Sequence, residues 1–386
     1  MLDGHDVMGA AQTGSGKTAG FTLPLLERLM TTGHQVKPGH IRALVLTPTR
    51  ELALQVHENV TAYAKYLPLS ADAIFGGVKP GPQIKRLAHG VDVLVATPGR
   101  LLDLHGQGVL NFASLQILVL DEADRMLDMG FIRDIQKVMR LLPPRKQCLM
   151  FSATFSPSIR KLAAGLLHQP KQIEVSPPNQ ANSQIDHLVH PCDMARKTEL
   201  LIHLIQQGQW PQVLVFSRTK HGANRVVTKL LNHQIEAAAI HSNKSQGART
   251  RALSGFKSGE IKVLVATDIA ARGIDIHQLP CVVNLDLPNV AEDYVHRIGR
   301  TGRAGEDGYA ISLVAAEEVL LLKAIEKLIG QPLRKQEVEG FEPTVLKAEP
   351  LDLSGGRGRR PQRQKRSGAG VHGGAGSARP RRRRQG

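Results

Sequence analysis

The chain has 386 residues, of which 41% are hydrophobic and 4% aromatic, and its formal net charge is +16. This length predicts about two domains with substantial cores, and the excess of positive charge favours an anionic partner. The sequence contains neither a secretory leader nor a run of eighteen apolar residues, so we predict neither secretion nor a membrane span.

Short β-rich runs alternate with amphipathic helical stretches through the first half of the chain. This alternation is typical of a parallel α/β sheet. Helices are predicted over 51–66 and 132–142. Strands are predicted at 6–10, 43–47, 72–75, 92–96, 116–120, 147–151 and 172–175.

A glycine-rich loop follows the first predicted strand and reads Ala11-Gln12-Thr13-Gly14-Ser15-Gly16-Lys17-Thr18. Gly14 and Gly16 let backbone N–H groups approach a phosphate, and the next helix points its N-terminus at the anion. Lys17 adds positive charge for the β- and γ-phosphates, and the Thr18 hydroxyl is suited to ligate Mg²⁺. The strict pattern has glycine where this chain has Ala11, but the strand–loop–helix context favours an ATP site over a ligand-free turn.

An acidic pair, Asp121 and Glu122, follows the apolar run 117–120. An acid at the carboxyl end of a central parallel strand lies beside the phosphate loop in such sheets. Asp121 is therefore predicted to hold Mg²⁺, through water, and Glu122 to orient and deprotonate the attacking water. The alternative is a pair of acids that complements a helix dipole, which fits poorly after a fully apolar strand.

A Pro-, Asn- and Ser-rich break at 177–184 predicts a linker, after which the alternation repeats. We therefore place the first α/β domain at 1–176 and the second at 185–335, with a cleft between them. Further helices are predicted over 220–232, 246–257 and 317–328. Further strands are predicted at 185–190, 213–216, 237–240, 262–266, 281–286 and 310–314.

Positive charge for the γ-phosphate is expected from the second domain. The segment 296–303 contains Arg297, Arg300 and Arg303, spaced by glycines in the manner of arginine fingers. A solvated basic turn is the alternative for this segment taken alone.

The final segment, 336–386, loses the α/β pattern and becomes rich in Gly and Arg, so a disordered tail is predicted. Residues 351–386 hold eleven Lys or Arg and one acid, a net charge of +10. The preceding 350 residues therefore carry only +6 of the total.

Taken together, these motifs resemble the DEAD-box ATP-dependent RNA helicases of superfamily two, from residue 6 to about residue 328. In the first domain the resemblance is carried by AQTGSGKT (11–18), PTRELALQ (48–55), Gly76-Gly77, TPGRLLD (97–103), DEAD (121–124) and SAT (152–154). In the second it is carried by VLVFSRT (213–219), Gln246 with Arg249, ATDIAARGID (266–275) and HRIGRTGR (296–303). The segments 217–224 and 241–253 are most similar to the bacterial RhlE subgroup.

The resemblance implies two RecA-like domains, joined by a short linker, that close on ATP and RNA. It implies γ-phosphate contacts from Arg300 and Arg303 and a ribose contact from Asp275. Coupling of hydrolysis to RNA and joining of the domains are implied for Asp124, Ser152, Thr154, His296 and Arg297. Contacts with the RNA backbone are implied for Pro48, Thr49, Arg50, Gly77, Thr97, Gly99, Arg100, Arg218, Arg249 and Thr267.

The composition agrees with recognition of the RNA backbone rather than of its bases. Few aromatic residues are available for base stacking, whereas hydroxyls and arginines suit phosphates and 2′-OH groups. The implied mechanism is local strand separation, in which ATP-driven closure bends the RNA and hydrolysis reopens the cleft. The basic tail is predicted to tether RNA, because acidic residues would serve solubility better. Ribosome-assembly and RNA-decay factors are the candidate protein partners.

The family's Q motif, which reads adenine, has no counterpart in residues 2–8. We expect a misassigned start or a truncated chain; if the loss is real, turnover should be weaker and less selective for ATP. Two other functions stay open, namely an RNA clamp or chaperone with impaired turnover and a DNA-directed motor of superfamily two. The DEAD, SAT and HRIGRTGR sequences argue against the DNA motor.

The three cysteines, Cys148, Cys192 and Cys281, are widely separated and lack metal-ligand spacing. Cys148 lies in an apolar run, which favours a buried strand residue over a redox or zinc role. The histidines form no HxxxH or Cys/His cluster, so no metal held by the protein alone is predicted. Unpaired cysteines suit a reducing compartment, and we expect a cytoplasmic protein.

Overall fold

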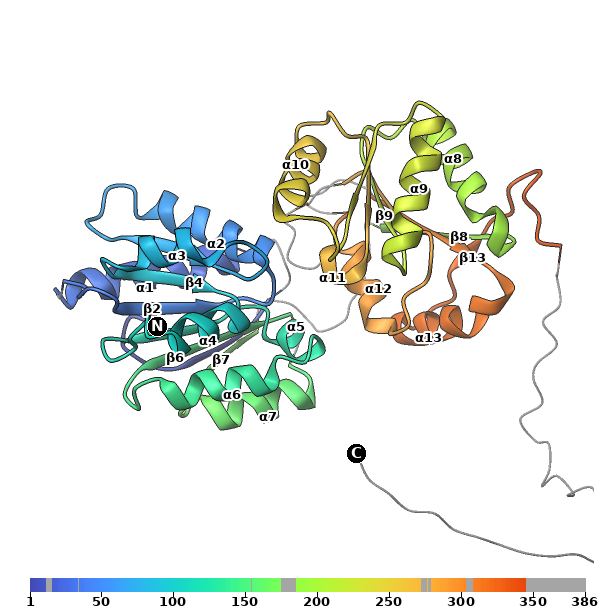
Figure 1. Ribbon diagram of the computed structural model, residues 1–386. Helices are drawn as coiled ribbons and strands as arrows, with labels where there is room; N and C mark the ends of the chain where they lie inside the picture. The colour runs from blue at the N-terminus through green and yellow to red at the C-terminus, as the bar shows by residue number, and fades with distance from the viewer. Residues whose placement is uncertain are drawn as a thin grey trace, which may run out of the picture. The chain divides into compact units, whose positions relative to one another are not determined.

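The computed structural model describes residues 1–11, 16–33, 35–153, 155–174, 185–271, 276, 279–302 and 308–344 (Figure 1). These residues all belong to the compact unit Met1–Leu346, and the second unit, Lys347–Gly386, is outside them. Several sequence predictions also fall outside the described residues: Gln12, Thr13, Gly14, Ser15, Thr154, Asp275, Arg303, the linker 177–184 and the tail from residue 345.

Seven parallel strands form the first sheet, in the order β3-β4-β2-β5-β6-β1-β7. All seven predicted strands are confirmed to within two residues at either end. The strands are β1 (Val7–Ala10), β2 (Ile41–Leu46), β3 (Ala71–Ile74), β4 (Val91–Ala96), β5 (Ile117–Leu120), β6 (Gln147–Ser152) and β7 (Lys171–Glu174). The helices are α1 (Lys17–Thr31), α2 (Arg50–Tyr63), α3 (Pro80–Leu87), α4 (Pro98–Gly106), α5 (Ala123–Asp128), α6 (Ile132–Leu141) and α7 (Pro157–Leu166).

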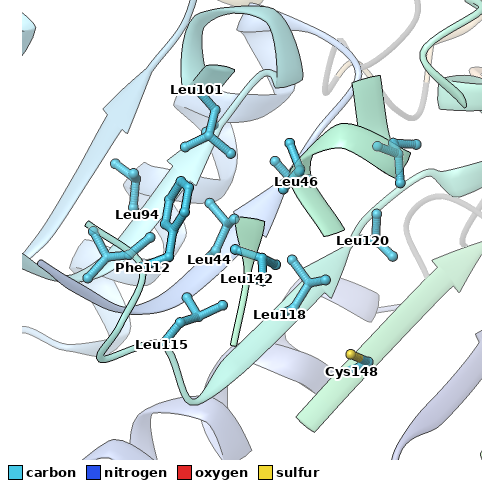
Figure 2. Close-up of a cluster of buried hydrophobic side chains, with 14 of the residues drawn as sticks. Leu44, Leu46, Leu94, Leu101, Phe112, Leu115, Leu118, Leu120, Leu142 and Cys148 are labelled. Carbon is cyan, nitrogen blue, oxygen red and sulfur yellow. The ribbon is translucent and has the colours of Figure 1, made fainter. Parts of the chain in front are cut away.

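Both faces of the first sheet are covered by helices, which explains why its central strands β2 and β5 are apolar at most positions. On β2, Leu44 and Leu46 point into a core shared with α4, α6 and α7, part of which is shown in Figure 2. Ala43 and Val45 alternate with them and pack in a second core with α1 and α2. Cys148 lies in the first core and is a free, buried strand residue, as predicted.

The second sheet repeats this architecture, with the strand order β10-β11-β9-β12-β13-β8-β14. If the seven strands of each sheet are numbered in chain order, both sheets have the same spatial order, 3-4-2-5-6-1-7. The strands are β8 (Ile185–Pro191), β9 (Val213–Phe216), β10 (Ala237–Ile240), β11 (Val263–Ala266), β12 (Cys281–Asn284), β13 (Gly308–Val314) and β14 (Arg334–Lys335). The α-helices are α8 (Lys197–Gly208), α9 (Lys220–Asn232), α10 (Gln246–Lys257), α11 (Asp268–Ala271), α12 (Ala291–Ile298) and α13 (Val319–Ile329), with 3₁₀ turns η1 (Met194–Arg196) and η2 (Ala316–Glu318).

The second sheet is also packed on both faces. Val213 and Val215 of β9 face a core with α8 and α9, whereas Leu214 and Phe216 face one with α10 and α11. A further core holds α12 and α13 against β8 and β13. All six predicted strands of this half are confirmed, and only the two-residue strand β14 was not predicted.

Hydroxyl side chains define where several helices begin. Thr49, Ser156, Thr219 and Ser245 precede helices, and each accepts a hydrogen bond from a backbone N–H of the first turn. Caps of this kind at Thr49 and Thr219 fix the chain where it leaves β2 and β9. The strand ends that carry candidate site residues are therefore stiffened locally.

The described chain beyond β14 packs on the second sheet. Gln336 donates its N–H to Val189 O, and its carbonyl contacts Nδ1 of His190 at 2.7 Å. Farther along, the Arg196 guanidinium lies over the Phe341 ring, and Thr344 donates to Asp193. The described part of the segment that the sequence assigned to the tail is thus attached to β8 and its neighbours. Among the described helices, none is both long and apolar enough to cross a membrane.

Candidate nucleotide and nucleic-acid site

The phosphate loop connects β1 to α1, and its two described ends are joined by a hydrogen bond. Lys17 donates from Nζ to the carbonyl oxygen of Ala11 at 2.7 Å. Gly16, the residue before α1, has φ +84°, and a Cβ there would meet nothing within 4 Å. Glycine is therefore needed at position 16 for backbone conformation rather than for space.

The acidic pair lies at the carboxyl end of β5, in the middle of the first sheet. Asp121 and Glu122 are 3% and 6% exposed. The pKa of Asp121 is raised to about 7, chiefly by burial; the Lys17 charge opposes the rise, and the Glu122 and Asp124 charges contribute to it. The loop lysine and the acids thus form one electrostatic site.

Asp124 links this acidic segment to the end of β6. One of its carboxylate oxygens accepts the N–H of Ala153 at 3.0 Å, and the other accepts the N–H of Arg125 at 3.0 Å. Ser152, the last residue of β6, is fully buried next to this contact. The structure therefore brings DEAD and SAT together through a backbone N–H, a contact compatible with the coupling role that the resemblance implies.

In the second domain, Arg297 of helix α12 is buried against the sheet. Its guanidinium contacts both carboxylate oxygens of Asp268 at 2.6 and 2.7 Å and donates to Asn284 Oδ1 and Asp286 O. The ring of Phe216 lies 4.9 Å from the guanidinium carbon. These contacts favour a role for Arg297 in the shape of the second-domain site. Asp268 and Asn284 were not singled out from the sequence, because nothing local pairs them with an arginine.

His296 and Arg300 lie on either side of Arg297; Arg300 is buried and His296 is half-buried. The pKa of His296 is lowered to about 4, chiefly by burial and then by the Arg125 charge, while the Asp124 charge opposes the shift. Arg300 is 4% exposed, and its carbonyl accepts the N–H of Leu279. The histidine is therefore neutral at physiological pH and suited to hydrogen bonding rather than to charge pairing.

Cations gather at the ends of β2 and β4, where RNA contacts were predicted. Burial lowers the pKa of Arg50, and the positive charges of Arg249 and Arg100 lower it further, whereas Glu51 raises it. Arg249 forms a 2.8 Å ion pair with Glu51, and Gln246 donates to the same carboxylate. Mutually repelling arginines held in place by neighbours are suited to bind an anion.

Two glycines and two arginines complete the first-domain group. A Cβ on Gly77 would lie 2.1 Å from Nη1 of Arg50. Any other residue at position 77 would therefore require the Arg50 guanidinium to move. Arg100 donates to Gln83 Oε1 and to Val78 O, and a Cβ on Gly99 would meet nothing within 4 Å. Pro48, Thr49 and Thr97 are buried at the strand ends, with Thr49 acting as the cap of α2.

On the second domain, Arg218 and Thr267 follow the ends of β9 and β11. Arg218 contacts Glu318 Oε1 at 3.0 Å, while its side chain keeps 41% of its surface exposed. Its backbone N–H donates to Asp286 at 2.8 Å. Thr267 is half-buried, and its carbonyl accepts the N–H groups of Ala270 and Ala271 in α11. Glu318 was missed from the sequence because it lies 100 residues from Arg218.

Comparisons with known proteins agree with this geometry. Residues 1–162 match the family model described as DEAD/DEAH box helicase, and residues 196–305 match the helicase conserved C-terminal domain. The chain is 40% identical over 337 residues to the ATP-dependent RNA helicase RhlB of Pseudomonas syringae pv. tomato, covering 86% of this chain and 85% of RhlB. This chain belongs to the DEAD-box ATP-dependent RNA helicases.

Two further relatives of this DEAD-box helicase extend the comparison. It is 42% identical over 334 residues to the ATP-dependent RNA helicase DBP3 of Lodderomyces elongisporus, covering 84% of this chain but 62% of DBP3. The structure of S. cerevisiae Dbp5 bound to RNA and ADP BeF3 superposes with a TM-score of 0.75 at 33% identity, covering 88% of this chain and 85% of Dbp5. The two-sheet architecture is therefore that of the DEAD-box helicases.

Proposed function

We propose that this DEAD-box helicase hydrolyses ATP at the first-domain loop and acidic pair and uses that cycle to separate or remodel RNA strands. The observation that carries the proposal is the electrostatic site shared by Lys17 and the buried Asp121 and Glu122. Lys17 would neutralise phosphate charge, and Glu122 would take the proton of the attacking water. Arg300 and Arg303 would contact the γ-phosphate, and Asp275 the ribose.

Mg²⁺ is expected to accompany ATP, held by the Thr18 hydroxyl and, through water, by Asp121. The residues fit such an ion, because a buried carboxyl whose pKa is raised to about 7 would be stabilised in its charged form by a cation. When bound, the ion neutralises charge on the transferring phosphoryl group. The protein residues then have to orient the water and keep Asp121 beside the loop.

RNA binding is proposed along the strand ends that carry Arg50, Gly77, Arg100, Arg218 and Arg249. The clustered arginines and exposed N–H donors support contacts with phosphates, which read no sequence. The other proposed contacts are Pro48, Thr49, Thr97, Gly99 and Thr267. Asp124, Ser152, Thr154, His296 and Arg297 would couple hydrolysis to RNA.

The finer assignments are proposals as well. We propose domains at 1–176 and 185–335, a linker at 177–184, a basic tail from 336, and a cytoplasmic location. Membership of the RhlE subgroup rests on the segments 217–224 and 241–253 alone, whereas the relatives reported above are RhlB and DBP3. Ribosome-assembly and RNA-decay factors are the proposed protein partners.

The test is to measure ATP hydrolysis by the full chain with single-stranded RNA and with DNA of the same sequence. We expect RNA to raise kcat at least about tenfold and DNA to have little effect, because 2′-OH contacts distinguish the two. Equal stimulation by DNA would favour a DNA-directed motor. RNA strand separation that survives in Lys17→Ala would favour a clamp or chaperone.

A further inference from the structure

Arg125 is a buried cation next to the acidic pair, and no role has been assigned to it above. It is the third residue of α5, and its side chain is 4% exposed. Its Nη1 lies 3.5 Å from Oε2 of Glu122, whose side chain is 8% exposed. Ion pairs three residues apart normally lie on a solvated helix surface, where they contribute little to stability. This pair is instead enclosed within the catalytic site.

The two facing atoms share an unusual property. Within the described part of the chain, neither Arg125 Nη1 nor Glu122 Oε2 has a hydrogen-bond partner, although both are buried. An optimised pair of this kind has its nitrogen and oxygen about 2.7–2.9 Å apart. Leaving two charged atoms buried and unsatisfied is costly, so a purely structural pair would be expected to close. A carboxylate oxygen kept free in this way can accept a proton or a hydrogen bond from a reacting group.

The backbone of Glu122 explains why a second residue is needed to fix its carboxylate. Glu122 has φ +52° and ψ +51°, and its side chain forms no cap with α5. A non-glycine residue in this left-handed region costs about 1–2 kcal/mol, and such strain gathers at functional sites. The Glu122 N–H donates to Asp121 Oδ1 at 3.0 Å, which fixes the backbone but not the side chain. Among the described residues, Arg125 is the cation paired with that side chain.

We propose that Arg125 is a positioning residue that aims Oε2 of Glu122 at the attacking water. The proposal rests on the function proposed above, in which Glu122 acts as the base. Arg125 does not itself contact the reacting atoms; it restricts the Glu122 side chain to one orientation on a strained backbone. Removing it should therefore slow the chemical step and leave nucleotide binding unchanged.

The experiment compares Arg125→Gln, Arg125→Lys and the control Arg140→Gln, which changes an exposed arginine on α6. RNA-stimulated ATP hydrolysis gives kcat and KM, and binding of a fluorescent ADP analogue gives Kd. We expect Arg125→Gln to lower kcat about tenfold or more, with KM and Kd within about twofold of wild type. Arg125→Lys, which keeps the charge, should recover kcat to within about threefold of wild type, and Arg140→Gln should have no effect.

The decisive experiment adds Arg125→Gln to the Glu122→Gln variant and measures the rate of ATP hydrolysis under single-turnover conditions. If Arg125 acts through Glu122, the second substitution costs nothing further, because residues that act as a unit are non-additive. An equal loss in both backgrounds, or a rise in KM with unchanged kcat, would overturn the proposal. The proposal would also be overturned if Arg125→Gln fails to fold while Arg125→Lys folds and keeps wild-type kcat. The positive charge would then be needed for folding alone.

The same data separate this proposal from the function on which it rests. If Glu122→Gln alone keeps wild-type kcat, Glu122 is not the base and the proposed chemistry fails. If Glu122→Gln abolishes turnover while Arg125→Gln stays within twofold of wild type, the chemistry stands and only the positioning role is refuted.

Discussion

The arrangement of Gly77 and Arg50 shows how one backbone position sets the place of a charge. Gly77 has φ +75°, which L-residues rarely adopt, and any Cβ there would overlap the Arg50 guanidinium. Arg50 also lies near two other cations, Arg100 and Arg249, whose positive charges lower its pKa. The position of this candidate RNA contact therefore depends on a neighbour without a side chain.

Gly77→Ala is expected to weaken RNA binding about five- to tenfold, because it strains the backbone and displaces one phosphate-binding guanidinium. KM for ATP should stay unchanged at saturating RNA. Fluorescence anisotropy with a short single-stranded RNA measures the effect. Gly76→Ala is the matched control, since a Cβ there would meet nothing within 4 Å and the backbone φ is ordinary. Wild-type affinity in both variants would remove Arg50 from the RNA site.

At the scale of elements, the second domain is organised around one buried carboxylate. Glu318 of η2 is 2% exposed and forms ion pairs with Lys197 at the start of α8 and with Arg218 after β9. It also accepts N–H groups from Leu287 and Ala315, and Lys197 donates to Leu285 O at 2.8 Å. One side chain thus joins four segments and holds Arg218 where nucleic-acid contact is proposed.

Glu318→Gln should destabilise the second domain by about 3–5 kcal/mol, because it leaves the Lys197 ammonium buried without its counter-charge. Urea unfolding measures the loss. Lys197→Met combined with Glu318→Gln should cost less than the sum of the two single changes, since the orphaned charge is gone. Strictly additive losses would mean that the ion pair contributes little.

Acid should destabilise the second domain by placing a charge on the buried ring of His190. Burial lowers the pKa of His190, whose Nδ1 lies 2.7 Å from Gln336 O. A histidine held neutral by folding loses its contribution as pH falls through the ordinary value near 6.5 towards the lowered pKa. The melting temperature should therefore fall on acidification over this range. His190→Asn keeps a donor near the Nδ1 position and cannot be protonated, so its melting temperature should depend less on pH; an unchanged pH dependence would contradict this account.

The same elements explain what could be predicted from the sequence. Apolar runs bounded by turn residues predicted every strand except β14. The carboxyl end of a central strand led to the prediction that Asp121 lies beside the phosphate loop. The strand β14 has only the exposed Arg334 and Lys335, which carry no apolar pattern. The carboxylates that pair with buried cations, such as Glu318 and Asp268, were missed. A charged residue is expected to be solvated when only the sequence is known, because the arginine that pairs with it is distant in the chain. The left-handed conformation of Glu122 likewise leaves no sequence signal, since glycine is the usual marker of that region.

At the scale of the whole molecule, two sheets with the same strand order carry different chemistry. The carboxyl end of β1 leads into the phosphate loop, whereas the equivalent strand β8 leads into Cys192 and the turn η1. The second domain instead supplies arginines from α12 and the residues after it: Arg297 is held by Asp268 and Asn284, and Arg300 is also buried. The charge is just as unequal along the chain, since residues 351–386 carry +10 of the net +16.

Deletion of 351–386 should weaken RNA affinity at low salt and reduce its salt dependence, because the tail's cations would release counterions from RNA. Binding titrations at several salt concentrations give the slope of log K against log salt for the full and shortened chains. The ATPase rate at saturating RNA should not change. Identical affinities and slopes for the two chains would refute the tether.

We propose that ATP hydrolysis at the Asp121–Glu122 site drives repeated separation of RNA strands. The most direct measurement follows the release of a labelled strand from a short RNA duplex in the presence of ATP. The duplex is in excess over the protein, and wild type is compared with Glu122→Gln. Wild type should release many strands per molecule, and Glu122→Gln, which still binds ATP, should release at most about one, because loss of the base slows hydrolysis 10²–10⁴-fold. Repeated release by Glu122→Gln, or by wild type without ATP, would contradict the account.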